Sequence, residues 1–424
     1  MADRIQFGDF ELDTRCFELR RGMQRIKLER IPMELLILLA GSGGRLVERR
    51  EVVKAIWGQG HFLESESAVN TAVRKLRRVL GDDAKQPVFI ETVPGKGYRF
   101  LVKNSVGWAA HEGMALYQRG LHYWNRKTPE SYLEAIRLYQ KSIDADPDQP
   151  LPYLGLAKTW IMFGIHGLQP PHDVYPRARA AVAKTLEIDP LVAEAHASMG
   201  DIVKGYDWDW ARAEKHYLRA LELDPQCAVA HQWYANLLSI VGRHEEALRH
   251  ATEARMLEPL SVGPAGFVGF TLLRAGRYRE ALRQSETALT LEPNSPIANW
   301  FLGQAFTALE QFGKAQEAFS AAVENSHGAN MYLAALGHVY GASGKVARAA
   351  EVLGKLEQLA GERYVSPLDL GIVCIGLERI DAAFEYLSVA LEQRVMRLTE
   401  LAMPMFKRLR GDPRYDEIVG RVGL

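Results

Sequence analysis

The sequence predicts a mainly α-helical protein in which a small α+β domain precedes a long α-solenoid. Two observations predict this fold. Within the first hundred residues, a basic amphipathic helix is followed by a short β-hairpin. Beyond about residue 109, one alanine-centred pattern recurs at a nearly constant spacing, and such helical repeats bury their apolar faces against one another. We therefore expect domains at 1–104 and 109–424, joined by a short link around Asn104–Gly107.

Residues 66–80 predict a helix with two different faces. At about 100° per residue, one side collects an apolar stripe made of Val69, Ala72, Val73, Leu76, Val79 and Leu80. The other side collects the polar and basic residues Asn70, Thr71, Arg74, Lys75, Arg77 and Arg78. Because no acidic residue interrupts this second face, it suits a groove lined by phosphates. Ser65 or Ser67 is expected to cap the start of the helix, and Gly81 its end.

A hairpin is predicted directly after this helix. Residues 89–93 and 98–102 are rich in β-branched and aromatic side chains, which favour strands. The sequence Pro94-Gly95-Lys96-Gly97 between them has the composition of a turn. Lys96 then lies at the tip and Arg99 beside it, where both can reach nucleic acid.

At this point the chain resembles the OmpR/PhoB-type winged-helix DNA-binding domain, over residues 3–103. Residues 5–12, 17–20 and 26–28 match the small antiparallel sheet with which that family opens. Residues 32–40, 49–57 and 69–80 match its three helices, and the wing, at 93–100, ends in Gly97-Tyr98-Arg99-Phe100. Pro94 is a departure, since many relatives carry a basic residue there.

The resemblance implies that the third helix lies in the major groove of double-stranded DNA. Asn70, Thr71 and Arg74 are expected to contact bases. Arginine pairs well with guanine and asparagine with adenine, each for about 1–3 kcal/mol of discrimination. Lys75, Arg77 and Arg78 are expected to contact phosphates, which set affinity and register. Lys96 and Arg99 would serve the wing.

The rest of the chain carries eight units of a repeat. Alanine recurs at positions 135, 178, 213, 247, 281, 315, 349 and 383. The last five steps are all 34 residues, which is the period of the tetratricopeptide helix pair. A proline follows twelve residues later at positions 147, 190, 225, 259 and 293. The longer second unit predicts an extended loop near His166–His172, and residues 410–422 predict a terminal capping helix. This part resembles the tetratricopeptide tails that follow winged-helix domains in many bacterial regulators.

The first helix of each such unit lines a concave groove, so exposed side chains there are candidate ligand contacts. By register these residues are Asn236, Arg274, Trp300, Gln304 and His338. Trp300 is expected to anchor an apolar side chain and Arg274 a carboxylate. The alternative, that all five are ordinary solenoid surface, stays open. The expected ligand is a protein or peptide, or a second copy of the chain in a homodimer.

The distribution of charged residues along the sequence also divides the chain into two parts. The whole chain is neutral, but residues 1–103 hold 19 Lys or Arg against 14 Asp or Glu, and the remainder holds 33 against 38. The first part is therefore net +5 and the second net −5, which suits a DNA-facing head. No apolar leader or membrane span is evident, and three scattered cysteines fit a reducing cytoplasm.

No motif for catalysis, a cofactor or a metal is found, and the proximity of His166 and His172 is interpreted as coincidence. We therefore expect a cytoplasmic, non-enzymatic transcriptional regulator that binds promoter DNA, with RNA polymerase as a further candidate partner. The alternative is a protein-interaction scaffold whose winged helix has become a docking module. Salt dependence distinguishes the two, because DNA binding weakens as salt rises.

Overall fold

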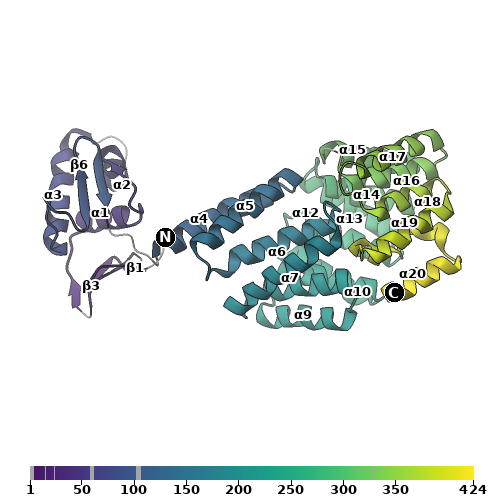
Figure 1. The fold of residues 1–424 in the computed structure, drawn as a ribbon, viewed down its shortest axis with the longest axis horizontal. Coiled ribbons are helices and arrows are strands. Elements are labelled where there is room, and N and C mark those ends of the chain that lie inside the picture. Colours follow the sequence, from purple (N-terminus) through teal and green to yellow (C-terminus); the bar gives the residue numbers. More distant parts are fainter. Residues whose placement is uncertain (1–3, 15, 23, 58–61, 102–106, 327) are drawn as a thin grey trace. The chain divides into compact units, whose positions relative to one another are not determined.

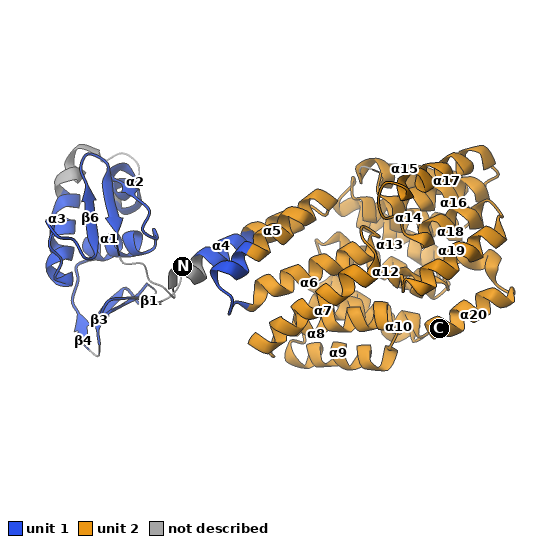
Figure 2. Ribbon diagram, viewed as in Figure 1, with its two compact units in different colours: residues 1–118, 141–149 blue, residues 119–140, 150–424 orange. Residues whose placement is uncertain are grey.

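The computed structural model describes residues 4–14, 16–22, 24–57, 62–101, 107–326 and 328–424 (Figure 1). Its contacts divide the chain into two compact units, residues 1–118 with 141–149 and residues 119–140 with 150–424 (Figure 2). The expected domain boundary near residue 104 falls outside the described residues. The bounds 1–104 and 109–424 therefore stay predictions.

The chain opens with an antiparallel sheet whose strands follow one another in order. These strands are β1 (Arg4–Phe7), β2 (Phe10–Asp13), β3 (Glu18–Arg21) and β4 (Gln24–Ile26). Gly8, at a φ of +52°, turns the chain between β1 and β2, so residues 5–12 form a hairpin. Leu12 pairs with Leu19 across β2 and β3, and both side chains are fully buried. The expected N-terminal sheet is confirmed.

Three helices and a second sheet complete the N-terminal fold. They are α1 (Arg30–Ala40), β5 (Val47–Glu48), α2 (Arg49–Trp57), α3 (Phe62–Leu80), β6 (Ile90–Val93) and β7 (Gly97–Phe100). The second sheet has the order β5-β7-β6 and is antiparallel. Both α1 and α2 pack against α3. Because α3 begins at Phe62, Ser65 and Ser67 lie within the helix, and the prediction that one of them caps it is wrong.

The solenoid is built from successive helix pairs. The helices are α4 (Gly107–Trp124), α5 (Pro129–Ala145), α6 (Pro150–Ile165), α7 (Pro171–Ile188), α8 (Ala193–Ile202), α9 (Trp210–Leu223), α10 (Ala228–Ile240), α11 (His244–Leu257), α12 (Val262–Arg274), α13 (Tyr278–Leu291), α14 (Pro296–Ala308), α15 (Phe312–Asn325), α16 (Asn330–Ala342), α17 (Val346–Ala360), α18 (Pro367–Gly376) and α19 (Ile380–Glu392). A short π-helix, η1 (Val203–Asp207), extends α8.

The recurring alanines explain how these helices pack. All eight lie in the second helix of a pair, and all have no exposed surface. The glycine twelve residues earlier serves the same contact, because a Cβ on Gly303 would lie 2.5 Å from the Phe319 ring. Small residues on facing helices let the pairs approach closely and stack into a continuous core. The predicted solenoid fold is confirmed.

The second tetratricopeptide repeat, formed by α6 and α7, is longer than the others for a different reason from the one expected. Only residues 166–170 separate α6 from α7, and these two helices have 16 and 18 residues. The additional residues therefore lengthen helices, and the predicted long loop around His166–His172 is wrong. A helix was expected over residues 410–422, and α20 (Pro413–Val422) forms there and packs on α19.

The segment between α19 and α20 crosses the inner side of the solenoid. It forms two 3-10 helices, η2 (Met396–Glu400) and η3 (Pro404–Leu409). Helix η2 packs on α6 and η1, whereas η3 packs on α14 and α18. All of these neighbours belong to first helices of their pairs, so residues 396–409 lie against the face that was expected to be an open groove.

Candidate nucleic-acid interface

Helix α3 presents the two faces that its sequence predicts. Val69, Ala72, Val73, Leu76 and Leu80 are at most 4% exposed and join the core of the N-terminal domain. Asn70, Thr71, Arg74 and Arg78 lie on the exposed side. Helix α3 ends at Leu80, and Gly81 follows it with a φ of +68°, as expected of a glycine that terminates a helix. The apolar stripe thus holds the polar side of α3 toward solvent.

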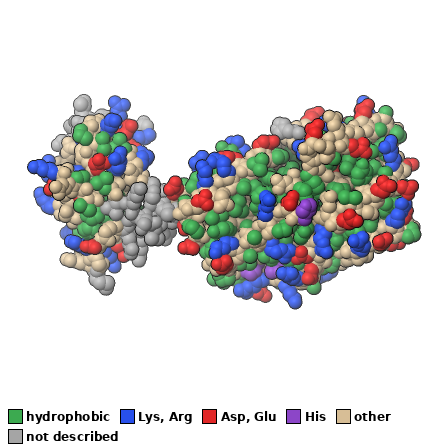
Figure 3. Space-filling model, viewed as in Figure 1, with side chains coloured by type: hydrophobic (Ala, Val, Ile, Leu, Met, Phe, Trp, Pro, Cys, Tyr) green, Lys and Arg blue, Asp and Glu red, His purple; other side chains and the backbone are tan. Residues whose placement is uncertain are grey.

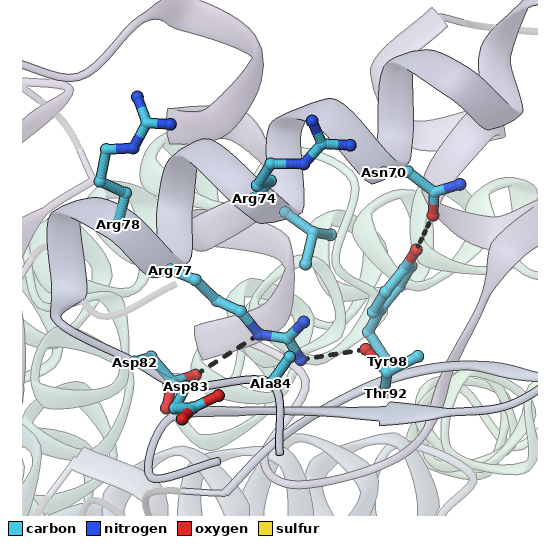
Figure 4. Close-up of a pocket in the computed structure, with 10 residues that line it drawn as sticks. Asn70, Arg74, Arg77, Arg78, Asp82, Asp83, Ala84, Thr92 and Tyr98 are labelled. Carbon is cyan, nitrogen blue, oxygen red and sulfur yellow. Dashed lines mark hydrogen bonds and ion pairs between the residues drawn. The ribbon is translucent and has the colours of Figure 1, made fainter. Parts of the chain in front are cut away.

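Arg77 departs from its predicted place among the phosphate contacts. Its side chain is only 13% exposed and turns toward the hairpin, away from Arg74 and Arg78 (Figure 4). It donates to the backbone oxygen of Ile90 at 2.6 Å and to Thr92 Oγ1 at 3.0 Å. Its long side chain reaches β6 because the strand runs beside the helix, so Arg77 joins α3 to the wing.

Asp82 supports the same junction and was not identified from the sequence. Its carboxylate is fully buried and accepts hydrogen bonds from the backbone N–H groups of Val88, Phe89 and Ile90 at 2.6, 3.1 and 2.9 Å. The carboxylate also lies 3.8 Å from Arg77 Nε. The sequence does show a carboxylate directly after the glycine that terminates the helix. It does not show the three partners of this carboxylate, because the path of the loop brings residues 88–90 to it.

The other cations divide into paired and unpaired groups. Lys75 forms an ion pair with Glu29 at 2.7 Å, and Arg99 one with Glu91 at 2.8 Å. Both pairs are substantially exposed, and such pairs are worth at most about 1 kcal/mol, so phosphates can replace the carboxylates. Within the described residues, Arg74, Arg78 and Lys96 have no ion pair.

The wing is a tight turn held against α2. Lys96 N donates to the backbone oxygen of Val93, and Arg49 N donates to that of Lys96. Gly95 has a φ of +72°, and a Cβ on Gly97 would lie 2.0 Å from the backbone oxygen of Val47. Both positions therefore require glycine. The turn leaves the Lys96 side chain exposed at the tip of the hairpin.

A hollow of about 500 Å³ separates the exposed side of α3 from the wing. Asn70, Arg74, Arg78, Thr92 and Tyr98 are among the residues that line it (Figure 4). The Tyr98 hydroxyl donates to Asn70 Oδ1 at 2.8 Å across this hollow. The sequence did not identify Tyr98 as part of the site. Helix and wing thus form one surface that carries cations and amide donors.

The groove residues expected in the solenoid are placed differently from the prediction. Trp300, Gln304 and His338 are 4%, 3% and 4% exposed, so the expectation that they are surface side chains is wrong. Arg274 and Asn236 are half-buried. Burial lowers the pKa of Arg274 to about 10, and its guanidinium donates to the backbone oxygen of Thr399 at 3.0 Å.

The segment at residues 396–409 contributes to this burial, because η3 packs on α14, the helix that carries Trp300 and Gln304. Met396 lies 3.4 Å from the Tyr175 hydroxyl, and Arg397 forms a buried ion pair with Asp369 at 2.7 Å. The Arg274 guanidinium was expected to bind a carboxylate of a ligand. Its acceptor is instead a backbone oxygen of η2, that of Thr399. The predicted groove contacts therefore lie largely inside the protein, and their binding role stays untested.

Comparison with known proteins agrees with this division of the chain. Residues 23–100 match the family model "Transcriptional regulatory protein, C terminal". Residues 216–249 and 271–330 match models of the tetratricopeptide repeat. The uncharacterized transcriptional regulatory protein YrkP of Bacillus subtilis is 34% identical over 93 residues, which are 22% of this chain and 40% of YrkP. The chain spans about two fifths of the length of the first curated relatives it matches.

Two solved structures are similar to different parts of the chain. The Klebsiella pneumoniae RstA DNA-binding domain, in complex with the RstA box, is 28% identical, with a TM-score of 0.22; the match covers 23% of this chain and 97% of that one. A monomeric mutant of IFIT1 is 14% identical with a TM-score of 0.52, covering 93% of this chain and 90% of that one, and shares the fold alone. The chain thus carries an OmpR/PhoB-type winged-helix DNA-binding domain of the transcriptional regulatory proteins at its N-terminus, followed by tetratricopeptide repeats.

Proposed function

We propose that this chain is a non-enzymatic, cytoplasmic transcriptional regulator that binds promoter DNA through α3 and the β6–β7 wing. One observation carries the proposal. Asn70, Arg74 and Arg78 project from one side of α3, and no acidic residue occurs in α3 from Ala68 to Leu80. A surface of this kind attracts the phosphate backbone and brings donors to the edges of bases in the major groove.

The structure supports a revised division of roles among the cations. Arg74 lies nearest the middle of the exposed face and is assigned to a base edge. Arg78 and Lys75 are assigned to phosphates, and Lys96 and Arg99 to the backbone or groove beside the wing. Arg77 is assigned to holding helix and wing in register, because one of its terminal nitrogens donates to both Ile90 and Thr92 of β6. DNA binding then uses fewer cations than the sequence suggested.

The solenoid is proposed to receive a protein partner, with RNA polymerase or a second copy of the chain as candidates. Because residues 396–409 cover the inner face, we expect such a partner to bind elsewhere on the helices. On the face shown in Figure 3, basic and acidic side chains are interspersed over the solenoid, which favours a mixed-charge protein surface over DNA. None of the described helices has the length and apolar composition needed to cross a bilayer.

Selection of bound fragments from a genomic library tests the proposal. The full-length protein is compared with an Arg74→Ala/Arg78→Ala variant at near-physiological salt. An Arg21→Ala/Arg25→Ala variant removes the same charge from the N-terminal sheet and serves as the control. We expect the native protein and the control to recover a shared motif that the α3 variant does not.

Recovery of the same fragments by all three proteins would reject α3 as the interface. Failure of the native protein to recover any shared motif would favour the scaffold alternative. In that case the protein partners of the solenoid would become the main question.

A further inference from the structure

The amide of Asn70 is oriented by a neighbour on a different element. Tyr98, on β7, donates its hydroxyl hydrogen to Asn70 Oδ1, and the two heavy atoms are 2.8 Å apart. Asn70 itself is exposed and lies at the edge of the hollow between α3 and the wing (Figure 4). Its amide oxygen therefore faces the protein, and its amide nitrogen is directed outward.

Tyr98 is rigid enough to hold this orientation. Its ring is 1% exposed, and its backbone pairs with Val47 on one side and Thr92 on the other. The guanidinium of Arg49 lies over the ring, 5.4 Å from the centroid. A buried aromatic ring loses little conformational freedom on making a hydrogen bond, so the hydroxyl is preorganised for Asn70.

This orientation changes what Asn70 can recognise. An asparagine that pairs with adenine in the major groove donates to N7 and accepts from the N6 amino group, so it needs both ends of its amide. Here one of the two lone pairs of Oδ1 is held by Tyr98, and the amide nitrogen with its two N–H donors is directed outward. Guanine presents two adjacent acceptors, O6 and N7, which match two donors.

We propose that Tyr98 fixes the Asn70 amide with its nitrogen toward the DNA, so that this side chain selects guanine over adenine at one position of the DNA site. This inference rests on the proposed function and replaces the adenine pairing expected from the sequence. Asn70 contacts the base, whereas Tyr98 is a positioning residue that acts through it. The pair couples specificity in the helix to the wing, because β7 carries both Tyr98 and Gly97 of the turn.

The test uses full-length protein and a duplex carrying the motif recovered from the genomic selection. Each base pair of the motif is replaced in turn, and Kd is measured by fluorescence anisotropy for the native protein, N70A and Y98F. Arg78→Ala is the control for a phosphate contact, which should weaken binding to every duplex by the same factor. Hydrogen exchange of β6 and β7 verifies that Y98F keeps the native fold.

At one base pair we expect the native protein to prefer guanine over adenine by roughly tenfold. N70A should abolish that preference and leave other positions unchanged. Y98F keeps Asn70 but frees its oxygen, so guanine and adenine should come within about threefold of each other at the same pair. A loss confined to one base pair is a readout that a purely structural role of Tyr98 would not produce.

Three results would overturn the inference while leaving DNA binding intact. These are a native preference for adenine at the Asn70-dependent pair, an unchanged guanine preference in Y98F, and no base pair that responds to N70A. If the native protein selects no motif at all, the proposed function fails first, and this inference fails with it.

Discussion

Arg77 and Arg78 are adjacent in sequence, but the structure indicates different roles for their side chains. Two single alanine substitutions can distinguish these roles. Arg77 donates two hydrogen bonds to β6, and its Nε lies 3.8 Å from the buried carboxylate of Asp82. Arg78 is exposed on the side of α3 that faces away from β6. Arg77→Ala should therefore damage the fold of the helix–wing junction, whereas Arg78→Ala should damage DNA binding alone.

The magnitude follows from the contacts. Hydrogen bonds that involve a charged group are worth about 1.5–3 kcal/mol each, and the 13% exposure of Arg77 reduces their value. We therefore expect Arg77→Ala to lower the free energy of opening of the wing by about 3 kcal/mol. That change corresponds to roughly two orders of magnitude in exchange rate. An exposed substitution such as Arg78→Ala typically changes stability by less than about 0.5 kcal/mol.

Two assays on the full-length protein measure the two effects. Hydrogen exchange of peptides over residues 69–100 reports opening of the wing. The slope of log Kd against log salt reports phosphate contacts, and removal of one contact reduces it by about 0.9. We expect faster exchange of β6 in Arg77→Ala, and a smaller salt slope with native exchange in Arg78→Ala.

The opposite pattern would refute the reasoning. If Arg77→Ala exchanged like the native protein and reduced the salt slope by about one phosphate, Arg77 would be a DNA contact, as the sequence alone suggested. If Arg78→Ala left the slope unchanged, Arg78 would not contact a phosphate.

Three further predictions concern the solenoid. Burial lowers the pKa of His338 to about 4, so the unfolded state binds more protons than the folded state as pH drops from about 6.5 to about 4. His338 should therefore contribute about 3 kcal/mol to the loss of stability seen by denaturant unfolding over this range, beside the contributions of His166 and His250, whose pKa values are lowered in the same way. The fall should be smaller by that amount in His338→Gln, and an equal fall would contradict this. Asp369→Ala leaves the buried Arg397 with Glu400, 3.6 Å away, as its remaining carboxylate neighbour. The substitution should cost about 3 kcal/mol, measured as a lower thermal midpoint by circular dichroism, and an unchanged midpoint would argue against the pair. Ala281→Leu overpacks a fully buried helix contact and should cost about 1–3 kcal/mol in the same experiment, whereas a change at exposed Arg249 should cost little.

Much of the architecture is encoded in local periodicity and could be predicted. Helix α2 has the predicted bounds, and the alanine spacing located every second helix of the solenoid, because both patterns depend only on neighbours along the helix. The apolar stripe of α3 was predicted for the same reason. The two-residue strand β5 was not predicted, since so short a segment has no period to detect.

The parts that could not be predicted depend on contacts between distant residues. A helical wheel places Arg77 among the exposed cations, but its long side chain reaches the backbone of Ile90, thirteen residues away. The wheel gives no sign that the Tyr98 hydroxyl reaches Asn70. Register placed Trp300 and His338 on the inner face, and only the path of residues 396–409 shows that this face is covered.

The path of η2 and η3 has a consequence for how the solenoid folds. In an ordinary repeat array each unit touches its neighbours, so stability is nearly additive and the ends can fray. Here Met396 contacts Tyr175 in the second repeat, and η3 contacts α14 and α18 in later repeats. Residues 396–409 therefore connect repeats that are far apart in the sequence. These long-range contacts raise contact order and couple distant units. We therefore expect units two to eight to unfold in one cooperative step, and the early units to complete their packing on the ribosome only after residue 409 has been synthesised.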